Sequence, residues 1–211
     1  MFNKADYEAM HALVFRDDYS GFRPEIQEIP NGDGRADNMK RYAHIATKYF
    51  KTDQQRRDLM PYLEAAHNLA VACADIAKVP EEFMPKIEFG ALRVLDYPAG
   101  ATSNKHLDFD LFTLMVYRDQ PEYFKAEEVP ESKALHRIRL LNTQAHLGEL
   151  GELLGLGQAT PHEVLASEKR QHSIVYFAIP DHEALLPGGQ TVRDWLNERM
   201  GRSRTKFDKY E

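Results

Sequence analysis

The segment His106-Leu107-Asp108-Phe109 carries side chains that could bind a metal ion together. Alternate residues of an extended segment point to the same side, so the imidazole of His106 and the carboxylate of Asp108 can face one point. A third ligand from a distant part of the chain would complete the set. Two histidines and one carboxylate bind Fe(II) on one side and leave the other side open for oxygen. The alternative is that His106 and Asp108 are surface turn residues beside a core strand.

Four stretches of the chain have apolar residues at the three- and four-residue spacing of an amphipathic helix. We expect helices over residues 6–14, 38–50, 52–77 and 191–200. The third begins with Thr52-Asp53-Gln54-Gln55, which is typical of a capping box, and it stops before Pro80. Its apolar stripe includes Cys73, which we therefore assign to the core.

Short segments rich in β-branched and aromatic residues follow in the second part of the chain. They predict strands over residues 87–97, 111–117 and 172–179, with weaker candidates at 122–125 and 137–142. Strands and helices do not alternate, so the pattern favours an α+β fold with a mostly antiparallel sheet. We expect an N-terminal helical region, residues 1–84, packed on a core of residues 85–211 that ends in a helix.

Composition narrows the class of protein. The chain has 211 residues, 27 Lys and Arg against 33 Asp and Glu, and a net charge of -6. This balance disfavours binding to nucleic acid or to an anionic membrane. A single cysteine forms no internal disulfide and no Cys-rich zinc site, and no apolar run is long enough to span a membrane. We expect a cytoplasmic protein, a monomer or weak homodimer, that acts on a small molecule.

The remaining polar residues have plainer interpretations. We expect His146 to be structural, and we expect His172 to lie on the outer side of its strand, because it is out of phase with Ser173. Asp96 and Asp110 are expected to face solvent. The glycines from 148 to 157 lack the Lys-Ser/Thr ending and the following helix of a phosphate loop, so they indicate turns.

Several short motifs follow one another in a distinctive order between residues 92 and 180. They are Tyr97-Pro98, His106-Leu107-Asp108-Phe109 leading into Thr113-Leu114, the Gly-Glu-Leu segment after His146, Ala159-Thr160-Pro161-His162-Glu163-Val164, and the strand from Ser173 to Pro180. In this order the sequence resembles the Fe(II)- and 2-oxoglutarate-dependent oxygenases of the isopenicillin N synthase-like branch. The resemblance implies a double-stranded β-helix, or jelly-roll barrel, with the N-terminal helices packed outside.

The resemblance also implies roles for individual residues. His106, Asp108 and His162 match the iron ligands of the family, and Tyr97 and Ser173 match positions that contact the cosubstrate, 2-oxoglutarate. An intact Asp108 argues against halogenation, which needs the carboxylate removed to make room for halide. Three protein ligands leave open positions for a bidentate 2-oxo acid and O2.

The anchor for the distal carboxylate of 2-oxoglutarate departs from the family pattern. The family has Arg-x-Ser on the last strand, whereas Gln171 stands two residues before Ser173 and Arg170 is one place early. A bulge could turn Arg170 inward, Gln171 could bind the carboxylate more weakly, or Arg93 could substitute from the neighbouring strand. Arg93 is in phase with Tyr97, so it could face the cavity as a carboxylate partner; an outer salt bridge is the alternative.

The leading hypothesis is a non-haem Fe(II) oxygenase that couples decarboxylation of 2-oxoglutarate to hydroxylation, desaturation or ring closure of a small molecule. Loss of the Arg-x-Ser register motivates one alternative, an iron oxidase without 2-oxoglutarate in which the substrate itself ligates the metal. A further alternative is a catalytically silent jelly-roll protein that binds a metal without turnover.

Overall fold

The computed structural model describes residues 2–16, 18–24, 29–30, 36–37, 41–139 and 144–204. Antiparallel pairing organises its strands into a six-stranded sheet, a three-stranded sheet and a two-stranded ladder. The six-stranded sheet has the order β1 (Phe22–Pro24), β4 (Arg41–Ile45), β5 (Ala91–Tyr97), β11 (Gln171–Ala178), β7 (Phe112–Arg118), β9 (Gln144–Leu147). The three-stranded sheet has the order β6 (Ser103–His106), β10 (His162–Val164), β8 (Phe124–Ala126), and β2 (Ile29–Pro30) pairs with β3 (Ala36–Asp37).

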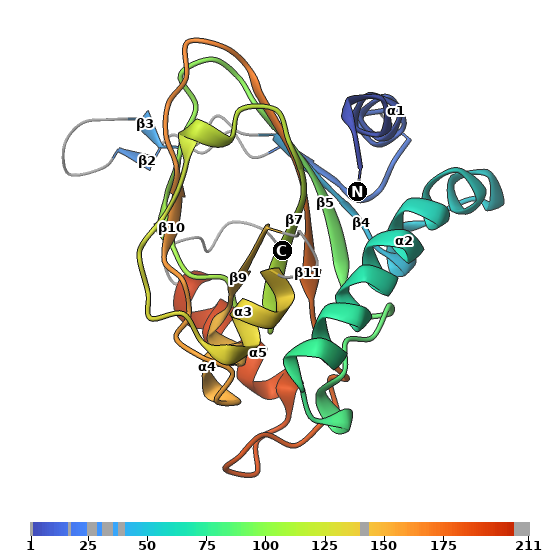
Figure 1. Cartoon of the computed structure of the whole chain (residues 1–211). Coiled ribbons are helices and arrows are strands. Elements are labelled where there is room, and N and C mark those ends of the chain that lie inside the picture. The colour runs from blue at the N-terminus through green and yellow to red at the C-terminus, as the bar shows by residue number, and fades with distance from the viewer. Residues whose placement is uncertain are drawn as a thin grey trace.

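The two larger sheets face each other across a small apolar cluster. Its members come from both sheets and from the loop after β5: Tyr42, Leu95, Tyr97, Ala101, Met115, Val164 and Val175, with Phe124 and Phe177 packed against them. We call the side of the six-stranded sheet that carries this cluster its inner face. Figure 1 shows β10 on one side of this space and β5, β7 and β11 on the other.

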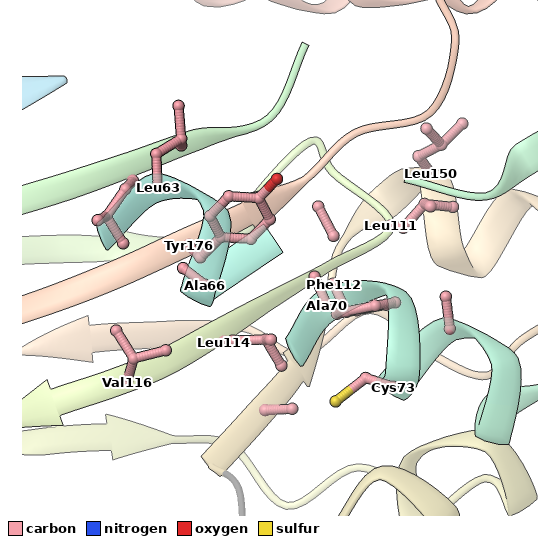
Figure 2. Close-up of a cluster of buried hydrophobic side chains, with 14 of the residues drawn as sticks. Leu63, Ala66, Ala70, Cys73, Leu111, Phe112, Leu114, Val116, Leu150 and Tyr176 are labelled. Carbon is pink, nitrogen blue, oxygen red and sulfur yellow. The ribbon is translucent and has the colours of Figure 1, made fainter. Parts of the chain in front are cut away.

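The opposite, outer face of the six-stranded sheet carries the main hydrophobic core. Helices α1 (Lys4–Val14) and α2 (Asp53–Ala77) lie on this side, away from β10 (Figure 1). In Figure 2, Leu63, Ala66, Ala70 and Cys73 of α2 meet side chains of the sheet, among them Phe112, Leu114 and Tyr176. The apolar stripe predicted for this helix is therefore its buried side, and Cys73 is core, as expected.

The ends of α2 follow from local chemistry. Thr52 Oγ1 accepts a hydrogen bond from the Gln55 backbone N–H at 3.1 Å, which satisfies one free donor of the first turn. The Gln55 side chain bonds the backbone N–H of Lys51 at 2.8 Å, so only one half of the predicted capping box forms. At the other end Lys78 adopts a left-handed conformation, φ 64°, which terminates the helix before Pro80.

Most of the remaining predicted elements are present. Strands β5, β7 and β11 lie within or close to the predicted ranges, although residues 87–89 form a turn before β5. Helix α5 (Val192–Arg204) begins after Thr191, whose Oγ1 accepts from the Asp194 backbone N–H at 3.1 Å. Of the weak candidate at 122–125, the 3₁₀ turn Pro121–Tyr123 takes the first part and β8 the second. In the described residues no helix is long and apolar enough to cross a membrane.

The helix predicted over residues 38–50 is wrong. Residues 41–45 form strand β4, which pairs with both β1 and β5, and Thr47–Tyr49 is a short 3₁₀ turn. Both faces of β4 are buried, with Tyr42 on the inner face and Ala43 and Ile45 in the outer core. A strand with apolar residues on both faces has no alternation of apolar and polar residues, and its apolar spacing can then match that of a helix. Residues 38–40 lie outside the described part of the chain.

The weak strand candidate at 137–142 is also wrong over the residues described there. Residues 133–139 form helix α3 (Lys133–Arg139), which buries Ala134, Leu135 and Ile138. Ser132 starts the helix, because its Oγ accepts from the Leu135 backbone N–H at 3.1 Å. Residues 140–143 fall outside the described residues. The segment between β9 and β10 contains helix α4 (Glu149–Leu153), so the turn predicted there is wrong at Gly151. Gly155 and Gly157 have φ of 73° and 149°, in keeping with the predicted turns.

Candidate metal centre and cosubstrate site

Pairing within the three-stranded sheet brings two of the predicted ligands together. His106 ends β6 and His162 begins β10, and the two residues are direct cross-strand partners. Their ring centroids lie 4.4 Å apart. The pairing of two short antiparallel strands thus brings together two residues that are more than fifty positions apart in the sequence.

Asp108, which follows β6, completes the group. Its carboxylate oxygens lie 3.7 Å from His106 Nε2 and 3.5 Å from His162 Nε2. One ligand atom from each of the three residues lies within 4.8 Å of the others, the spacing of a shared metal ion. The His106 side chain is 41% exposed and that of His162 is 6% exposed, so the group is closed on one side and open on the other.

Backbone carbonyls orient both imidazoles. Nδ1 of His106 lies 2.6 Å from the carbonyl oxygen of Asn104, and Nδ1 of His162 lies 3.0 Å from that of Thr160. With the proton on Nδ1 donated to the carbonyl, each Nε2 carries the lone pair that a metal would bind. The tautomer that a metal needs is therefore the one that the backbone favours.

Two neighbours hold the Asp108 carboxylate. Thr113 Oγ1 on β7 donates to Asp108 Oδ2 at 2.6 Å, and His146 Nε2 on β9 lies 3.1 Å from the same oxygen. Burial raises the pKa of Asp108, but the hydrogen bond from His146 and the charges of His146, His162 and His106 hold this pKa well below its usual range. Asp108 is thus ionised and fixed before any metal binds. His146 is placed to orient a predicted ligand, which is the kind of structural role expected of it.

The protonation state of His162 also suits metal binding. Burial, with His146 and His106 acting in the same direction, lowers the pKa of His162 to about 4, although Asp108 and the Thr160 carbonyl raise it. At neutral pH its imidazole is therefore uncharged, as a metal ligand must be. Two neutral imidazoles and one carboxylate are a donor set that fits Fe(II).

Asp110 lies beneath the metal group and does not face solvent, contrary to expectation. The residue is 2% exposed, and its Oδ2 lies 2.8 Å from Thr113 Oγ1, whose single proton goes to Asp108. Burial raises the pKa of Asp110 well above its ordinary value, and the nearby Asp108 charge adds to this. Asp110 was misassigned because it lies in the irregular segment just before β7, whose first five residues are all buried.

The residues predicted to contact the cosubstrate lie together on the inner face, except one. Tyr97 pairs with Gln171 across β5 and β11, and Ser173 pairs with Leu95. Tyr97, Gln171 and Ser173 are all less than 5% exposed. Gln171 Nε2 donates to the Leu165 carbonyl oxygen at 2.8 Å, which fixes the orientation of the amide.

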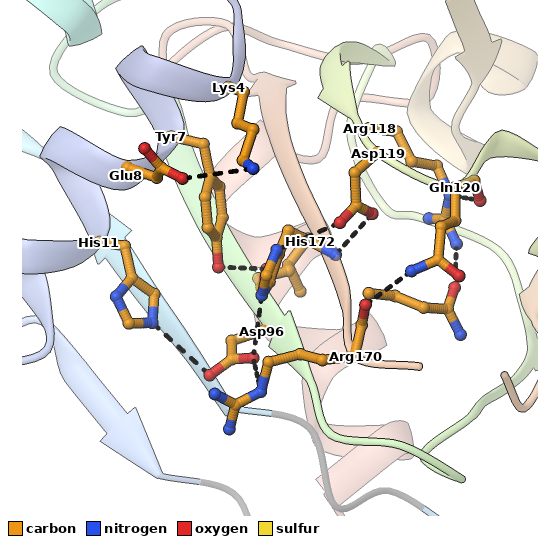
Figure 3. Close-up of polar contacts among 12 residues, drawn as sticks. Lys4, Tyr7, Glu8, His11, Asp96, Arg118, Asp119, Gln120, Arg170 and His172 are labelled. Carbon is orange, nitrogen blue, oxygen red and sulfur yellow. Dashed lines mark hydrogen bonds and ion pairs between the residues drawn. The ribbon is translucent and has the colours of Figure 1, made fainter. Parts of the chain in front are cut away.

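Arg170 is the exception, because it lies on the outer face. Its Nε is 3.1 Å from Oδ1 of Asp96, which is fully buried beneath α1, and His11 and His172 also approach that carboxylate (Figure 3). The alternative in which a bulge turns Arg170 inward is therefore wrong. Asp96 was also expected to face solvent, but α1 covers it and four basic side chains, including Arg41, surround it. His172 lies outside the inner face, as expected.

Sequence reasoning missed Arg118 at the end of β7. Its Nη2 donates to Gln171 Oε1 at 2.9 Å and its Nε to the Gln120 carbonyl oxygen at 3.0 Å, so both bonds go to neutral acceptors. Ser173 is its cross-strand partner. Burial lowers the pKa of Arg118 from its ordinary value, which marks a cation held away from water. In Figure 3, Arg118 lies beside Gln120, apart from the group around Asp96.

A β-bulge explains why Arg118 points inward. Along β11, Ile174 pairs with Tyr117 and Val175 pairs with Met115, so Val116 is an extra residue on β7. Regular alternation from Thr113 and Met115 would place Tyr117 inside and Arg118 outside. The extra residue reverses the phase. Tyr117 stacks on Tyr7 of α1 on the outer side, and Arg118 joins the inner face.

Arg93 also lies on the inner face. Its guanidinium carbon is 4.8 Å from the ring centroid of Tyr42 and 4.5 Å from that of Phe177. The outer salt bridge considered as an alternative is therefore not formed. The phase argument from Tyr97 correctly predicted the side of the sheet.

Comparison with known proteins supports the fold. No protein-family model matches the chain, and no curated protein matches it in sequence. Solved structures do match: a Shewanella oneidensis protein designated an oxygenase has a TM-score of 0.61 at 18% identity over 95% of this chain and 88% of its own. A full-length Neurospora crassa protein, crystallised in complex with alpha-KG and 5-formyluracil, has a TM-score of 0.61 at 14% identity over 96% of this chain and 84% of its own.

A third structure is the dioxygenase for auxin oxidation 1 from Arabidopsis thaliana, in a binary complex with 2-oxoglutarate. It has a TM-score of 0.50 at 16% identity over 84% of this chain and 78% of its own. At these identities the likeness shows the fold alone. The chain is an α+β protein with antiparallel sheets and the fold of 2-oxoglutarate oxygenases, and it carries a His–Asp–His group that could hold a metal ion.

Proposed function

We propose that the protein is an Fe(II)-dependent oxygenase that couples decarboxylation of 2-oxoglutarate to the oxidation of a small molecule, with His106, Asp108 and His162 as iron ligands. The observation that carries this proposal is the convergence of these three residues, open on one side, in a fold that known 2-oxoglutarate oxygenases share. The two facing sheets would then be the halves of a double-stranded β-helix, with α1 and α2 outside it.

The residues divide the work as follows. Fe(II) at this site would supply the activation of oxygen. Asp108 is held ionised by Thr113 and His146, so it needs no proton release when a metal binds. The uncharged imidazoles and this one carboxylate would leave a net positive charge on the metal, which an anionic 2-oxo acid offsets. Tyr97 and Ser173 would contact that acid on the inner face.

The first experiment tests the metal and the cosubstrate separately. Purified protein should bind one equivalent of Fe(II) anaerobically, develop a weak visible charge-transfer band with 2-oxoglutarate, and slowly form succinate once oxygen is admitted. His162→Ala should lose the iron, and His136→Ala, which alters an exposed histidine of α3, should keep it. Iron binding without the band or succinate would reject 2-oxoglutarate, and equal iron in both variants would reject the site.

We further propose that Arg118 is the anchor of the distal carboxylate of 2-oxoglutarate. In the family pattern Arg-x-Ser, Gln171 occupies the position of the arginine. Arg118 lies within hydrogen-bond distance of Gln171, so its guanidinium could take over the role of that arginine. Gln171 would orient the guanidinium and leave its remaining donors for the carboxylate. With a cation available here, the motive for an oxidase without 2-oxoglutarate is removed.

An exchange of the two side chains tests this anchor. Arg118→Gln should weaken 2-oxoglutarate binding by about 10- to 100-fold, the effect of losing hydrogen bonds to a charged group worth roughly 1.5–3 kcal/mol. The double variant Arg118→Gln with Gln171→Arg should recover much of that loss, since it restores a guanidinium beside Ser173. Arg170→Gln is the control, because Arg170 lies on the outer face, and it should leave the affinity unchanged. Unaltered affinity in Arg118→Gln would refute the assignment.

A further inference from the structure

Arg93 is a second cation on the inner face, and its guanidinium is held in place by aromatic rings. Tyr42 on β4 and Phe177 on β11 lie 4.8 Å and 4.5 Å from the guanidinium carbon. Such contacts use the face of the planar group and leave its N–H edge free for a ligand. Arg93 is thus oriented without consuming its hydrogen-bond donors.

One donor of Arg93 is buried and not satisfied by the protein around it. Its Nε is buried and has no hydrogen-bond partner among the described residues. The charge of Arg93 acts on the Asp110 carboxyl and lowers its pKa, but no hydrogen bond joins the two side chains among the described residues. Oδ2 of Asp110 bonds Thr113, and Oδ1 of Asp110 has no hydrogen bond. A buried guanidinium N–H without a partner costs free energy, so such a group calls for a partner that the chain does not supply.

The position of Arg93 separates it from the proposed cosubstrate anchor. Phe177, on which Arg93 stacks, is the cross-strand partner of Thr113, and Thr113 bonds Asp108. Arg93 itself pairs with Val175 of β11, whereas Arg118, on the other side of β11, pairs with Ser173, two residues earlier. The two backbone positions are therefore roughly 7 Å apart along the strand and about 10 Å apart across the sheet. One 2-oxoglutarate has one distal carboxylate, which Arg118 would bind. Arg93 therefore remains for a second anion nearer the metal group.

We propose that Arg93 binds an anionic group, most simply a carboxylate, of the molecule that the enzyme oxidises. This inference rests on the proposed function and narrows its substrate class to small organic acids. The rings of Tyr42 and Phe177 flank the guanidinium, so the part of the substrate next to its carboxylate would contact aromatic surface. The bidentate geometry of a carboxylate matches the N–H edge of the guanidinium.

The test compares acids with their own primary amides. The protein is loaded with Zn(II), which does not turn over, and saturated with 2-oxoglutarate, so the proposed anchor is filled. The probes are phenylacetate, cinnamate, indole-3-carboxylate and hexanoate, each with the matching amide. Binding is measured by saturation-transfer NMR and then by calorimetry. At least one acid should bind more tightly than its amide; no preference for any acid would overturn the inference.

Variants then assign that preference to Arg93. Arg93→Gln should weaken binding of the preferred acid by about 10- to 100-fold and leave its amide unchanged, whereas Arg93→Lys should retain part of the preference. Arg41→Gln is the matched control, since Arg41 is a half-exposed arginine of the adjacent strand that faces Asp96. An unchanged acid affinity in Arg93→Gln would refute the role of Arg93.

The outcomes also separate this inference from the proposed function. If Arg93→Gln weakens 2-oxoglutarate instead of the acids, Arg93 belongs to the cosubstrate anchor; the inference then fails while the oxygenase stands. If the wild-type protein binds neither Zn(II) nor 2-oxoglutarate, the proposed function fails, and the substrate class fails with it. Thermal unfolding of each variant shows whether a loss of binding reflects a loss of folded protein.

Discussion

Replacing His146 by phenylalanine distinguishes a supporting residue from a metal ligand. Nε2 of His146 lies 3.1 Å from Asp108 Oδ2, and its ring lies 4.2 Å from that of His162, centroid to centroid. Phenylalanine keeps an aromatic ring in this place, also next to Phe124, and removes the donor. Asp108 would then keep one of its two side-chain donors, the hydroxyl of Thr113.

The expected loss of metal affinity follows from the number of side-chain donors that Asp108 keeps. Removing a residue that only orients a ligand lowers metal affinity by about 10- to 100-fold, or roughly 1.4–2.7 kcal/mol. The effect should be in this range because Thr113, at 2.6 Å, holds the same oxygen more closely than His146 does. Loss of a true ligand would exceed this range and change the coordination geometry.

Titration with Co(II) measures both quantities at once, since the d–d bands report affinity and coordination number. His136→Phe is the control, because it replaces an exposed histidine of α3 that contacts only the surface carboxylate of Glu131 among the described residues. Metal binding by His146→Phe that equals the wild type would refute the role given to His146. Complete loss of binding, with an altered spectrum in any residual complex, would instead make His146 a fourth ligand.

Two further predictions concern stability. Because burial lowers the pKa of His162 to about 4, the unfolded chain binds the extra proton first, so the metal-free protein should lose up to about 3 kcal/mol of unfolding free energy as pH falls from 6.5 to 4. Urea titrations at several pH values in this range give the unfolding free energy at each pH. This free energy should fall less steeply with decreasing pH in His162→Gln than in the wild type, and an equal pH dependence would contradict the assignment. Asp96→Ala should destabilise the fold by more than about 1 kcal/mol, because it removes the buried carboxylate that the basic side chains around it share. In the same urea assay Glu8→Ala, an exposed carboxylate of α1, should change stability by less than about 1 kcal/mol, and similar losses in both variants would count against the buried cluster.

The sequence was informative where chemistry and local spacing coincide. His106 and Asp108 are two residues apart, so alternation on an extended segment brings them together without knowledge of the fold. His162 needed the order of motifs, because no local rule relates it to β6, and only the pairing of β6 with β10 explains the contact. Helix α2 was predictable because one face is apolar from Leu59 to Ala77 and a threonine starts the helix.

Burial that depends on a distant element was not predictable. Asp96 alternates as a solvent-facing residue would, and only the packing of α1 over β5 buries it. Strand β4 is covered on both faces by elements far away in sequence, so its apolar residues carry no period of two and its hydrophobic spacing resembles a helix. In both cases the missing information is which surface a later or earlier segment covers.

Arg118 shows why the anchor that we propose for the cosubstrate escaped sequence reasoning. The sequence argument considered a bulge on β11 near Arg170, because a bulge there would restore the family motif. The bulge instead lies on the neighbouring strand at Val116, and it brings inward an arginine that simple alternation assigns to the outside. Adjacent strands of a sheet present side chains to the same space, so a guanidinium can move from one strand to the next and still reach the same carboxylate. A motif written along one strand cannot represent this exchange, and a charge that is missing from such a motif should be sought on the strand beside it.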